Sequence, residues 1–174
     1  PPDDQVTPAK NDVVMAPAVA NLTDDNGDGR TDTFDIPDIV FISYDLEGDG
    51  CCNVRGTLRV VSGQCNPDGS MNTHASINDP HLDNSAGVAL GDLDGDGVPE
   101  IVTIIHDGSH PQGTVAFKRA ADDGSAWTIL WTNPDYPTWN VHQRGGAQPA
   151  LVDLTGDGTP EVLVGDSTRT RQIL

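Results

Sequence analysis

Four acids crowd into nine residues of the sequence. The stretch GDLDGDGVPEIV (91–102) carries Asp92, Asp94 and Asp96 at alternate positions, followed by Glu100. Like charges about 4 Å apart repel by about 1 kcal/mol per pair even in water. A bound cation would relieve this repulsion, so the spacing predicts a metal site.

The spacing of these acids suits a hard cation. Ca²⁺ takes about six to eight oxygen ligands at about 2.3–2.6 Å, and acids at positions 1, 3 and 5 of a tight loop point toward one centre. Gly95 and Gly97 allow the positive φ angles that such a loop needs. Val98 can offer only its backbone carbonyl at position 7, and Glu100 stands at position 9. An EF-hand loop has glutamate at position 12, which is Thr103 here, so this loop is shorter and leads directly into the apolar strand EIVTII.

The acidic loop recurs twice more in the chain. The segment LVDLTGDGTPEVLVG (151–165) repeats the offsets of 1, 3, 5 and 9, and VANLTDDNGDGRTDTFDIPDIVF (19–41) carries a longer loop between the same apolar flanks. Each unit has a small-residue strand, an acidic glycine loop, and then proline, an acid and a β-branched strand. The second and third loops begin 61 residues apart. Repeats of about 20–50 residues or slightly more indicate arrays, solenoids or propellers.

Further short strands are expected between the loops. GTLRVVSG (56–63) and GTVAFKRA (113–120) follow the first and second loops, and AWTILWT (126–132) adds a fourth strand to the second unit. No segment combines helical periodicity with caps, so we expect an all-β chain. Four short antiparallel strands per unit, separated by Gly, Pro, Asp and Asn, describe a β-propeller blade.

The repeated units resemble the FG-GAP (VCBS-type) repeats of integrin-α-like β-propellers, whose blades hold Ca²⁺ in a D-x-D-x-D-G-x-x-D/E loop between two strands. At about 60 residues per blade the chain would hold about two and a half blades, whereas closed propellers typically have about four to eight. We therefore expect a fragment of a larger propeller, or a ring completed by other copies. The expected division is an N-terminal extension (1–12), blade 1 with the extended loop and a Cys hairpin (13–80), blade 2 (81–142) and the start of a truncated blade 3 (143–174).

The resemblance implies one ion in each loop, about three Ca²⁺ ions in all. In the first loop spacing favours position 1 at Asp24, with Asp35 at the EF-hand-like or dockerin-like position 12, whereas strand alignment would put Asn21 and Asp38 at the two ends. We favour the spacing. The implied ligands are Asp24, Asn26, Asp28, the Arg30 carbonyl, Asp32 and Asp35 in the first loop; Asp92, Asp94, Asp96, the Val98 carbonyl and Glu100 in the second; and Asp153, Thr155, Asp157, the Thr159 carbonyl and Glu161 in the third.

Two features qualify this ligand set. Thr155 replaces the usual acid or amide, so the third site has one charge fewer and should bind more weakly. The alternative for all three loops is a solvated Asp/Gly turn that binds nothing, which the threefold recurrence disfavours. The role expected of the ions is architectural, because binding energy at a loop that forms only on folding becomes folding energy.

Acidic residues dominate the composition. The chain has 27 acidic and 9 basic residues, a net charge of −18, so nucleic acid and anionic membranes are poor partners. No apolar run of about 18 residues is available to insert into a bilayer. Sites with dissociation constants of about 10⁻⁴–10⁻³ M suit the calcium found outside cells. An extracellular, secreted or cell-surface location is therefore expected.

The three cysteines are compatible with that location. Cys51 and Cys52 lie in a hairpin whose far side reaches Cys65, so we expect one disulfide, Cys52–Cys65 or Cys51–Cys65. The alternative is a vicinal disulfide between the adjacent pair with Cys65 free. A zinc site is disfavoured because no second Cys or His pair has suitable spacing.

An aromatic segment follows the second unit. On a strand, Trp127, Ile129 and Trp131 would share one face and pack between neighbouring blades. Tyr136 and Trp139 come next in a Pro/Asn-rich loop, where an exposed ring can stack on a sugar or a partner protein. Packing is favoured over ligand contact.

No catalytic constellation is apparent in the sequence. His106 and His110 are four residues apart, but the segment IIHDGSHPQGT indicates a strand that ends in a turn, so a zinc or catalytic role is disfavoured. No Ser/His/Asp or Cys/His arrangement can be assembled. The chain is therefore expected to be non-enzymatic.

Three functions fit these expectations. The first, which we favour, is an extracellular adhesion or recognition module with structural Ca²⁺, binding a protein or glycan through loops on one propeller face. The second is the propeller part of a secreted carbohydrate-active enzyme resembling a polysaccharide lyase. The third is a structural subunit of a surface fibre whose exposed blade edges pair between chains. The fold alone cannot choose, since propellers host many unrelated activities.

Overall fold

The computed structural model of the chain describes residues 11–45, 55–106, 111–134, 148–165 and 170–173. All regular secondary structure in these residues is antiparallel β-strand, which confirms the predicted all-β class. Among them no helix is long and apolar enough to cross a membrane. The strands are β1 (Ala18–Ala20), β2 (Asp38–Ser43), β3 (Arg55–Cys65), β4 (Met71–Asp83), β5 (Ala89–Gly91), β6 (Glu100–His106), β7 (Pro111–Arg119), β8 (Trp127–Asn133), β9 (Ala150–Val152), β10 (Glu161–Gly165) and β11 (Thr170–Ile173).

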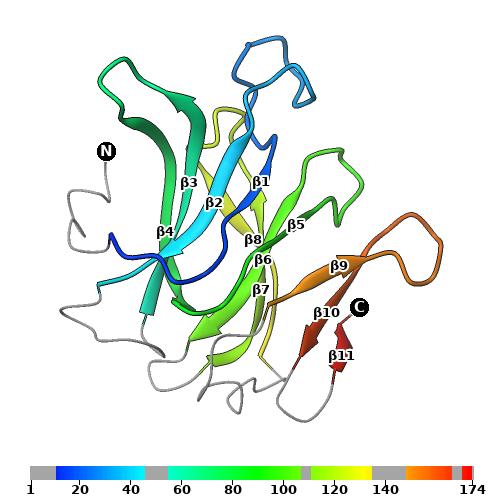
Figure 1. The fold of residues 1–174 in the computed structure, drawn as a ribbon. Helices are drawn as coiled ribbons and strands as arrows, with labels where there is room; N and C mark the ends of the chain where they lie inside the picture. The colour runs from blue at the N-terminus through cyan, green and yellow to red at the C-terminus, as the bar shows by residue number, and fades with distance from the viewer. Residues whose placement is uncertain (1–10, 46–54, 107–110, 135–147, 166–169, 174) are drawn as a thin grey trace.

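The strands form three successive units along the chain (Figure 1). Unit 1 is β1–β4, unit 2 is β5–β8 and unit 3 is β9–β11, and within each unit every strand pairs with the next one in the sequence. A single register pair, Leu82 of β4 with Ile105 of β6, joins units 1 and 2 into one eight-stranded sheet. Unit 3 is a separate three-stranded sheet, and neither sheet closes on itself within the described part of the chain.

The strands expected from the sequence are found, and two further strands, β4 and β11, were not expected. The small-residue segments form β1, β5 and β9, the segments after proline form β2, β6 and β10, and the three further segments correspond to β3, β7 and β8. β4 was not predicted, because its sequence MNTHASINDPHLD has few apolar side chains and its first three residues are exposed. β4 also continues past residue 80, where the sequence placed the end of the first unit.

Unit 2 is packed between the two other units. Along β6, Ile101 and Val102 point to opposite faces, as successive strand residues must. Ile101 belongs to a core shared with unit 1, whereas Val102 belongs to a core shared with unit 3. The first core includes Leu58, Val60, Ile101, Val115 and Phe117; the second includes Val102, Ile104, Ala116, Val162 and Val164. The largely apolar sequence of β6, in which the only polar residue between Glu100 and His106 is the buried Thr103, follows from burial of both faces.

The short first strands of the three units lie next to one another. β1 contacts β5, and β5 contacts β9. At the end of β5, a Cβ atom on Gly91 would lie 2.7 Å from Leu151 Cδ1 of β9. A glycine at this position therefore permits the close approach of units 2 and 3.

The expectation that the aromatic residues of β8 share a face is wrong. A β-bulge at Leu130 interrupts the pairing of β8 with β7, and an extra residue shifts the alternation of side chains. Trp127 consequently packs against the core between units 1 and 2, and Trp131 packs against the core between units 2 and 3. Ile129 is 48% exposed. Both tryptophans are packing residues, but at two different interfaces.

The disulfide expected to involve Cys65 is not formed. Cys65 is free and exposed at the end of β3. β3 begins at Arg55, and its 11 residues span roughly 33 Å at about 3.3 Å per residue. Cys65 therefore lies at the opposite end of β3 from Arg55. The other cysteines, Cys51 and Cys52, lie outside the described residues, as do His110, Tyr136 and Trp139.

Candidate metal centre

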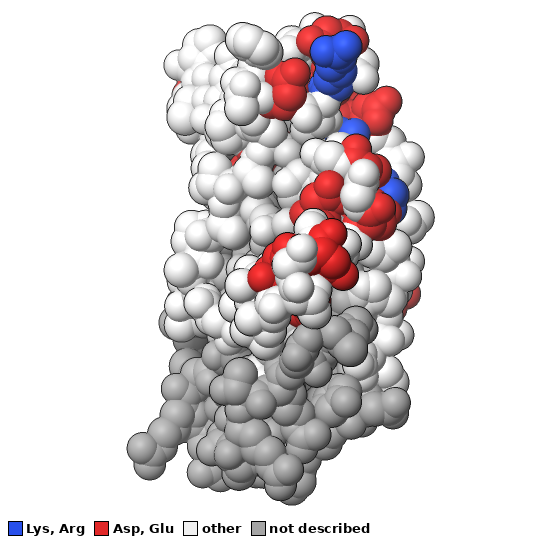
Figure 2. All heavy atoms as spheres, turned by 90° about the vertical axis from the view of Figure 1, so that its right-hand side faces the viewer, with Lys and Arg blue, Asp and Glu red and all other residues white. Residues whose placement is uncertain are grey.

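The three acidic loops lie along one side of the molecule. The first loop (residues 21–37) joins β1 to β2, the second loop (92–99) joins β5 to β6, and the third loop (153–160) joins β9 to β10. All three project toward the same side in Figure 1. Figure 2 shows that side directly, with Asp and Glu side chains gathered in a column. The fold thus repeats one acidic feature at regular intervals.

The aspartate at position 1 of each loop organises the turn. Asp92 Oδ1 accepts a hydrogen bond from Gly95 N at 2.7 Å, and Asp92 Oδ2 accepts one from Gly97 N at 2.9 Å. Both glycines have positive φ angles, 79° and 87°, which residues with a Cβ rarely adopt. The same two hydrogen bonds recur from Gly27 and Gly29 to Asp24 and from Gly156 and Gly158 to Asp153. The turn is therefore set locally in all three loops.

The aspartate at position 5 also bonds to the backbone. Asp96 Oδ1 accepts a hydrogen bond from Val98 N at 2.8 Å. The equivalent bonds are from Arg30 N to Asp28 and from Thr159 N to Asp157, both at 2.9 Å. These bonds hold position 7, whose carbonyl is the predicted backbone ligand, at a fixed distance from position 5.

A buried glutamate closes the second and third loops. Glu100 is 1% exposed, and its Oε2 accepts a hydrogen bond from Leu93 N at 2.7 Å. Glu161 Oε2 accepts the equivalent bond from Leu154 N at 2.6 Å. Burial raises the pKa of the Glu100 carboxyl above its ordinary value, and the nearby charges of Asp94 and Asp96 raise it further. A cation at this position would favour the ionised form of Glu100.

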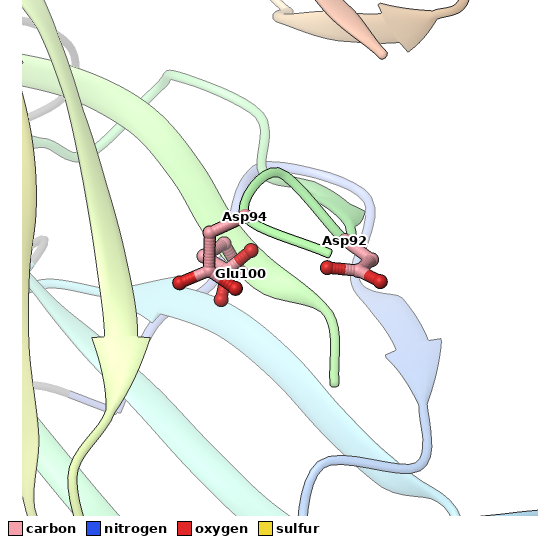
Figure 3. A group of neighbouring side chains, drawn as sticks. All are labelled: Asp92, Asp94 and Glu100. Atoms are coloured by element: carbon pink, nitrogen blue, oxygen red, sulfur yellow. The ribbon is translucent and has the colours of Figure 1, made fainter. Parts of the chain in front are cut away.

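The second loop brings three of its predicted ligands together (Figure 3). One carboxylate oxygen from each of Asp92, Asp94 and Glu100 lies within 4.8 Å of the others. Among the described His, Cys, Asp and Glu side chains, this is the group of three that meets this spacing. Such a donor set, made only of carboxylate oxygens, is the chemistry that Ca²⁺ and Mg²⁺ prefer.

The fourth acid of the second loop faces a lysine instead. Lys118 Nζ lies 2.8 Å from Asp96 Oδ2 and also contacts Asp94 Oδ2. The hydrogen bond from Lys118 holds the pKa of Asp96 below its ordinary value, and the two carboxylates raise the pKa of Lys118. Lys118 could not be recognised from the sequence as a neighbour of this loop, because 22 residues separate it from Asp96.

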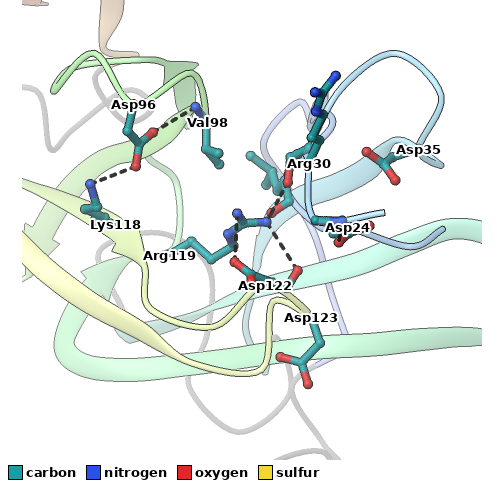
Figure 4. Close-up of polar contacts among 12 residues, drawn as sticks. Asp24, Arg30, Asp35, Asp96, Val98, Lys118, Arg119, Asp122 and Asp123 are labelled. Carbon is teal, nitrogen blue, oxygen red and sulfur yellow. Dashed lines mark hydrogen bonds and ion pairs between the residues drawn. The ribbon is translucent and has the colours of Figure 1, made fainter. Parts of the chain in front are cut away.

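The first loop uses two buried carboxylates, Asp35 and Asp38, where the other loops use one. Figure 4 labels Asp35 at this loop. Asp38 Oδ2 accepts a hydrogen bond from Leu22 N at 3.0 Å, which is the bond that Glu100 and Glu161 make in their units. Asp35, which is 6% exposed, accepts hydrogen bonds from Asp25 N at 3.1 Å and Asp32 N at 2.8 Å. The two alignments considered for this loop are both partly correct: spacing identifies the turn, and strand alignment identifies the anchor.

The remaining predicted ligands of the first and third loops are more dispersed. In the first loop, Asn26 Oδ1 accepts from Asp28 N and Asp32 Oδ1 accepts from Phe34 N. In the third loop, backbone N–H groups of Gly158 and Gly156 lower the pKa of Asp153. Neither loop gathers three carboxylates within the spacing found in the second loop. Thr155 removes one such group from the third loop.

A histidine supports the anchor of the first loop. His74 Nε2 of β4 lies 3.2 Å from Asp38 Oδ1, and Asp38 is fully buried. The neighbouring Asp38 carboxylate raises the pKa of His74 above its ordinary value, and burial opposes this rise. Thr23 Oγ1 donates a second side-chain hydrogen bond to Asp38 at 3.0 Å. Only strand pairing reveals these contacts, since β4 was not expected.

An arginine from unit 2 fixes the first loop in place. Arg119 Nη1 donates hydrogen bonds to Leu22 O at 2.8 Å and Thr31 Oγ1 at 2.7 Å, and Arg119 Nη2 lies 3.3 Å from Asp122 Oδ1. Asp24 N also donates to Asp122 O at 2.9 Å. Between the first and second loops lies a hollow of about 440 Å³ that Arg119 and Asp96 help to line.

Comparison with known proteins gives limited matches. No protein-family model matches the chain, and no curated protein matches it in sequence. The chain is similar to the crystal structure of the V. cholerae biofilm matrix protein Bap1, with 26% sequence identity, 90% of this chain and 29% of that chain covered, and a TM-score of 0.49. The chain thus spans less than a third of that protein's length.

Proposed function

We propose that the chain is a calcium-stabilised repeat module of the FG-GAP (VCBS) type that forms part of a β-propeller. One observation carries the proposal: the same hydrogen-bonded acidic turn occurs three times, and in the second loop three carboxylates converge. Repulsion among these carboxylates is relieved when a divalent cation binds them. The ions, about three in number, stabilise the turns that connect the first two strands of each unit.

Two features of the packing support the propeller part of the proposal. Unit 2 buries opposite faces of β6 and β7 against units 1 and 3, as a blade does between its two neighbours. The first strands β1, β5 and β9 are adjacent, as the innermost strands of successive blades would be. A complete ring needs about four or more such units, supplied by further blades or by other copies of the chain.

We further propose that the module is extracellular and non-enzymatic, and that it serves adhesion or the recognition of a protein or glycan. The acidic loops present one side rich in carboxylates to a partner, with a few Lys and Arg side chains among them (Figure 2). Calcium outside cells is concentrated enough to fill sites of about 10⁻⁴–10⁻³ M. The net charge of −18 keeps nucleic acid and anionic membranes away.

Calorimetric titration of chelator-treated protein with Ca²⁺ tests the metal proposal, with Mg²⁺ as the competing ion and the melting temperature followed in parallel. We expect about three calcium sites and a melting temperature that rises with calcium concentration. The double variant Asp94→Ala with Asp96→Ala should lose one site and part of that rise.

The matched control is Asp68→Asn, which removes an acid from an exposed Asp-Gly turn between β3 and β4 that lies outside the three loops. This variant should keep every calcium site. A melting temperature that does not respond to millimolar Ca²⁺ in the unmodified protein contradicts the proposal, as does an equal calcium response in the unmodified protein and the double variant.

A further inference from the structure

In the second loop a lysine side chain lies against two of the acids. Lys118, near the end of β7, contacts both the position-3 acid, Asp94, and the position-5 acid, Asp96. Figure 4 shows Lys118 beside Asp96. The side chains of Lys118 and Asp94 are 33% and 26% exposed. The side chain of Asp96 is 41% exposed, so the three charged groups contact one another at the surface.

The fold itself does not require a lysine at this position. In units 1 and 2 the strand that follows the loop pairs with the next strand, and the residue opposite the anchoring acid follows from the register. In unit 1 it is Ser62, which pairs with Asp38. In unit 2 Ile101 pairs with Phe117, so the next pair along the two strands is Glu100 with Lys118. Unit 1 therefore has a neutral serine where unit 2 has a lysine.

Asp94 belongs both to the ion pair with Lys118 and to the three converging carboxylates. Its carboxylate contacts Lys118, and it is also one of the three carboxylates that converge in the second loop. A metal ion held by Asp92, Asp94 and Glu100 therefore acts on a carboxylate that already neutralises a lysine. Two cations at this distance repel each other, so occupancy by one weakens the hold of the other.

We propose that Lys118 is an intrinsic competitor for the cation of the second loop and sets its affinity. This inference rests on the proposed calcium function of that loop. The four acids of the second loop would give it a higher affinity than the third loop, which has three. Lys118 offsets one of these charges. The second and third loops therefore have similar calcium affinities and fill over the same range of calcium concentration.

The test is the calcium affinity of the second loop with and without the lysine charge. A background protein carries Asp24→Asn and Asp153→Asn, which remove calcium binding by the first and third loops. In this background the protein that keeps Lys118 is compared with its Lys118→Met and Lys118→Arg variants by calorimetric titration with CaCl₂. Lys118→Met should bind calcium about tenfold more tightly, because it removes a competing charge from a partly exposed site. Lys118→Arg keeps the charge and should remain within about twofold of the lysine form.

A second measurement uses the unmodified chain and does not depend on the folding of the variants. The side-chain Cε–Hε NMR signals of Lys118 are followed as CaCl₂ is added, beside the amide signal of Gly95. We expect the Lys118 signals to shift in step with Gly95. Lys118 signals that stay fixed while Gly95 shifts overturn the inference.

The outcomes separate the two proposals. Calcium binding with equal second-loop affinity in the lysine and Lys118→Met forms overturns the role of Lys118 and leaves the calcium function intact. No calcium binding by the unmodified protein at millimolar CaCl₂ overturns the proposed function itself, and the inference with it.

Discussion

The first and second loops solve the same structural problem with different side chains. In the second loop Glu100 belongs to the converging carboxylates and also accepts the hydrogen bond from Leu93 N. In the first loop Asp38 accepts the equivalent bond from Leu22 N, while Asp35 bonds to the backbone of the loop. An aspartate is one methylene shorter than a glutamate, and the first loop is longer. A single side chain in the first loop therefore does not both accept the bond from Leu22 N and reach the other acids of the loop.

This difference separates two roles in the first loop: the anchoring of the loop, and the ion binding proposed for it. The anchor of the first loop is buried deep in unit 1, with Thr23 and His74 as additional partners. The carboxylate of Asp35, the proposed ligand, lies within the loop itself. Substitutions can therefore remove one role at a time in the first loop but not in the second.

The largest effect is expected from Asp38→Ala. This change leaves Leu22 N–H and the Thr23 hydroxyl without their acceptor in a buried site, which should lower the free energy of unfolding by about 3–5 kcal/mol. Glu161→Ala, which removes one such bond beside the exposed Leu154, should cost only about 1–2 kcal/mol. Urea unfolding in the presence of chelator measures both. Equal losses would show that the anchors are equivalent.

Asp35→Ala should separate ion binding from anchoring. It removes the acceptor of Asp25 N and Asp32 N, at a cost of about 2 kcal/mol, and should lower the calcium stoichiometry by one while the Asp38 anchor persists. Glu100→Ala should lose both the ion and the anchor of its loop. Calorimetric titration of the two variants with Ca²⁺ checks this. An unchanged stoichiometry in Asp35→Ala would show that the first loop does not bind calcium through Asp35.

Arg119→Met tests how far the first loop depends on unit 2. The hydrogen bonds from Arg119 to Leu22 O and Thr31 Oγ1 are partly exposed, so their loss should cost about 1–2 kcal/mol of unfolding free energy. Thr31→Val removes one of them and serves as the smaller matched change, at about 0.5–1 kcal/mol. If the two variants are equally stable, the Arg119 bond to Leu22 contributes nothing measurable.

The smallest effect concerns pH and the first unit. The pKa of His74 is raised by Asp38, so protonated His74 stabilises the fold fully below its ordinary pKa of about 6.5, and this contribution disappears as pH rises through the raised pKa. Asp25 and the backbone of Asp123 act on His74 in the same direction. Relative to His74→Gln, the unmodified protein should gain about 0.5–1 kcal/mol at pH 5.5 over pH 8.5. A pH-independent difference between the two would contradict this.

The sequence was informative wherever a structure is decided locally. The position-1 acids and the glycines of the turns lie within five residues of each other, so their spacing alone predicts the loops. β6 and β7 were predictable because each has a short apolar, β-branched or aromatic segment next to a turn signal, EIVTII after Pro99 and TVAF after Gly113. β4 was not, because a polar strand that relies on pairing with β3 shows no apolar pattern of its own.

The contacts that distinguish the loops were hidden from sequence reasoning. Lys118 and Arg119 reach acids and carbonyls 22 to 97 residues away, and only strand register brings them together. The face of Trp131 was mispredicted because a single bulge residue reverses the alternation along β8. Tertiary pairing, rather than local pattern, decides both.

Burial of both faces of β6 and β7 affects how the described part of the chain unfolds. Opposite faces of the same two strands serve the cores of two different neighbours, so the middle unit cannot open locally without exposing apolar surface on both sides. In arrays of this kind neighbouring units are coupled through their shared boundaries. The three units should therefore behave as one cooperative block, with fraying confined to the outer units.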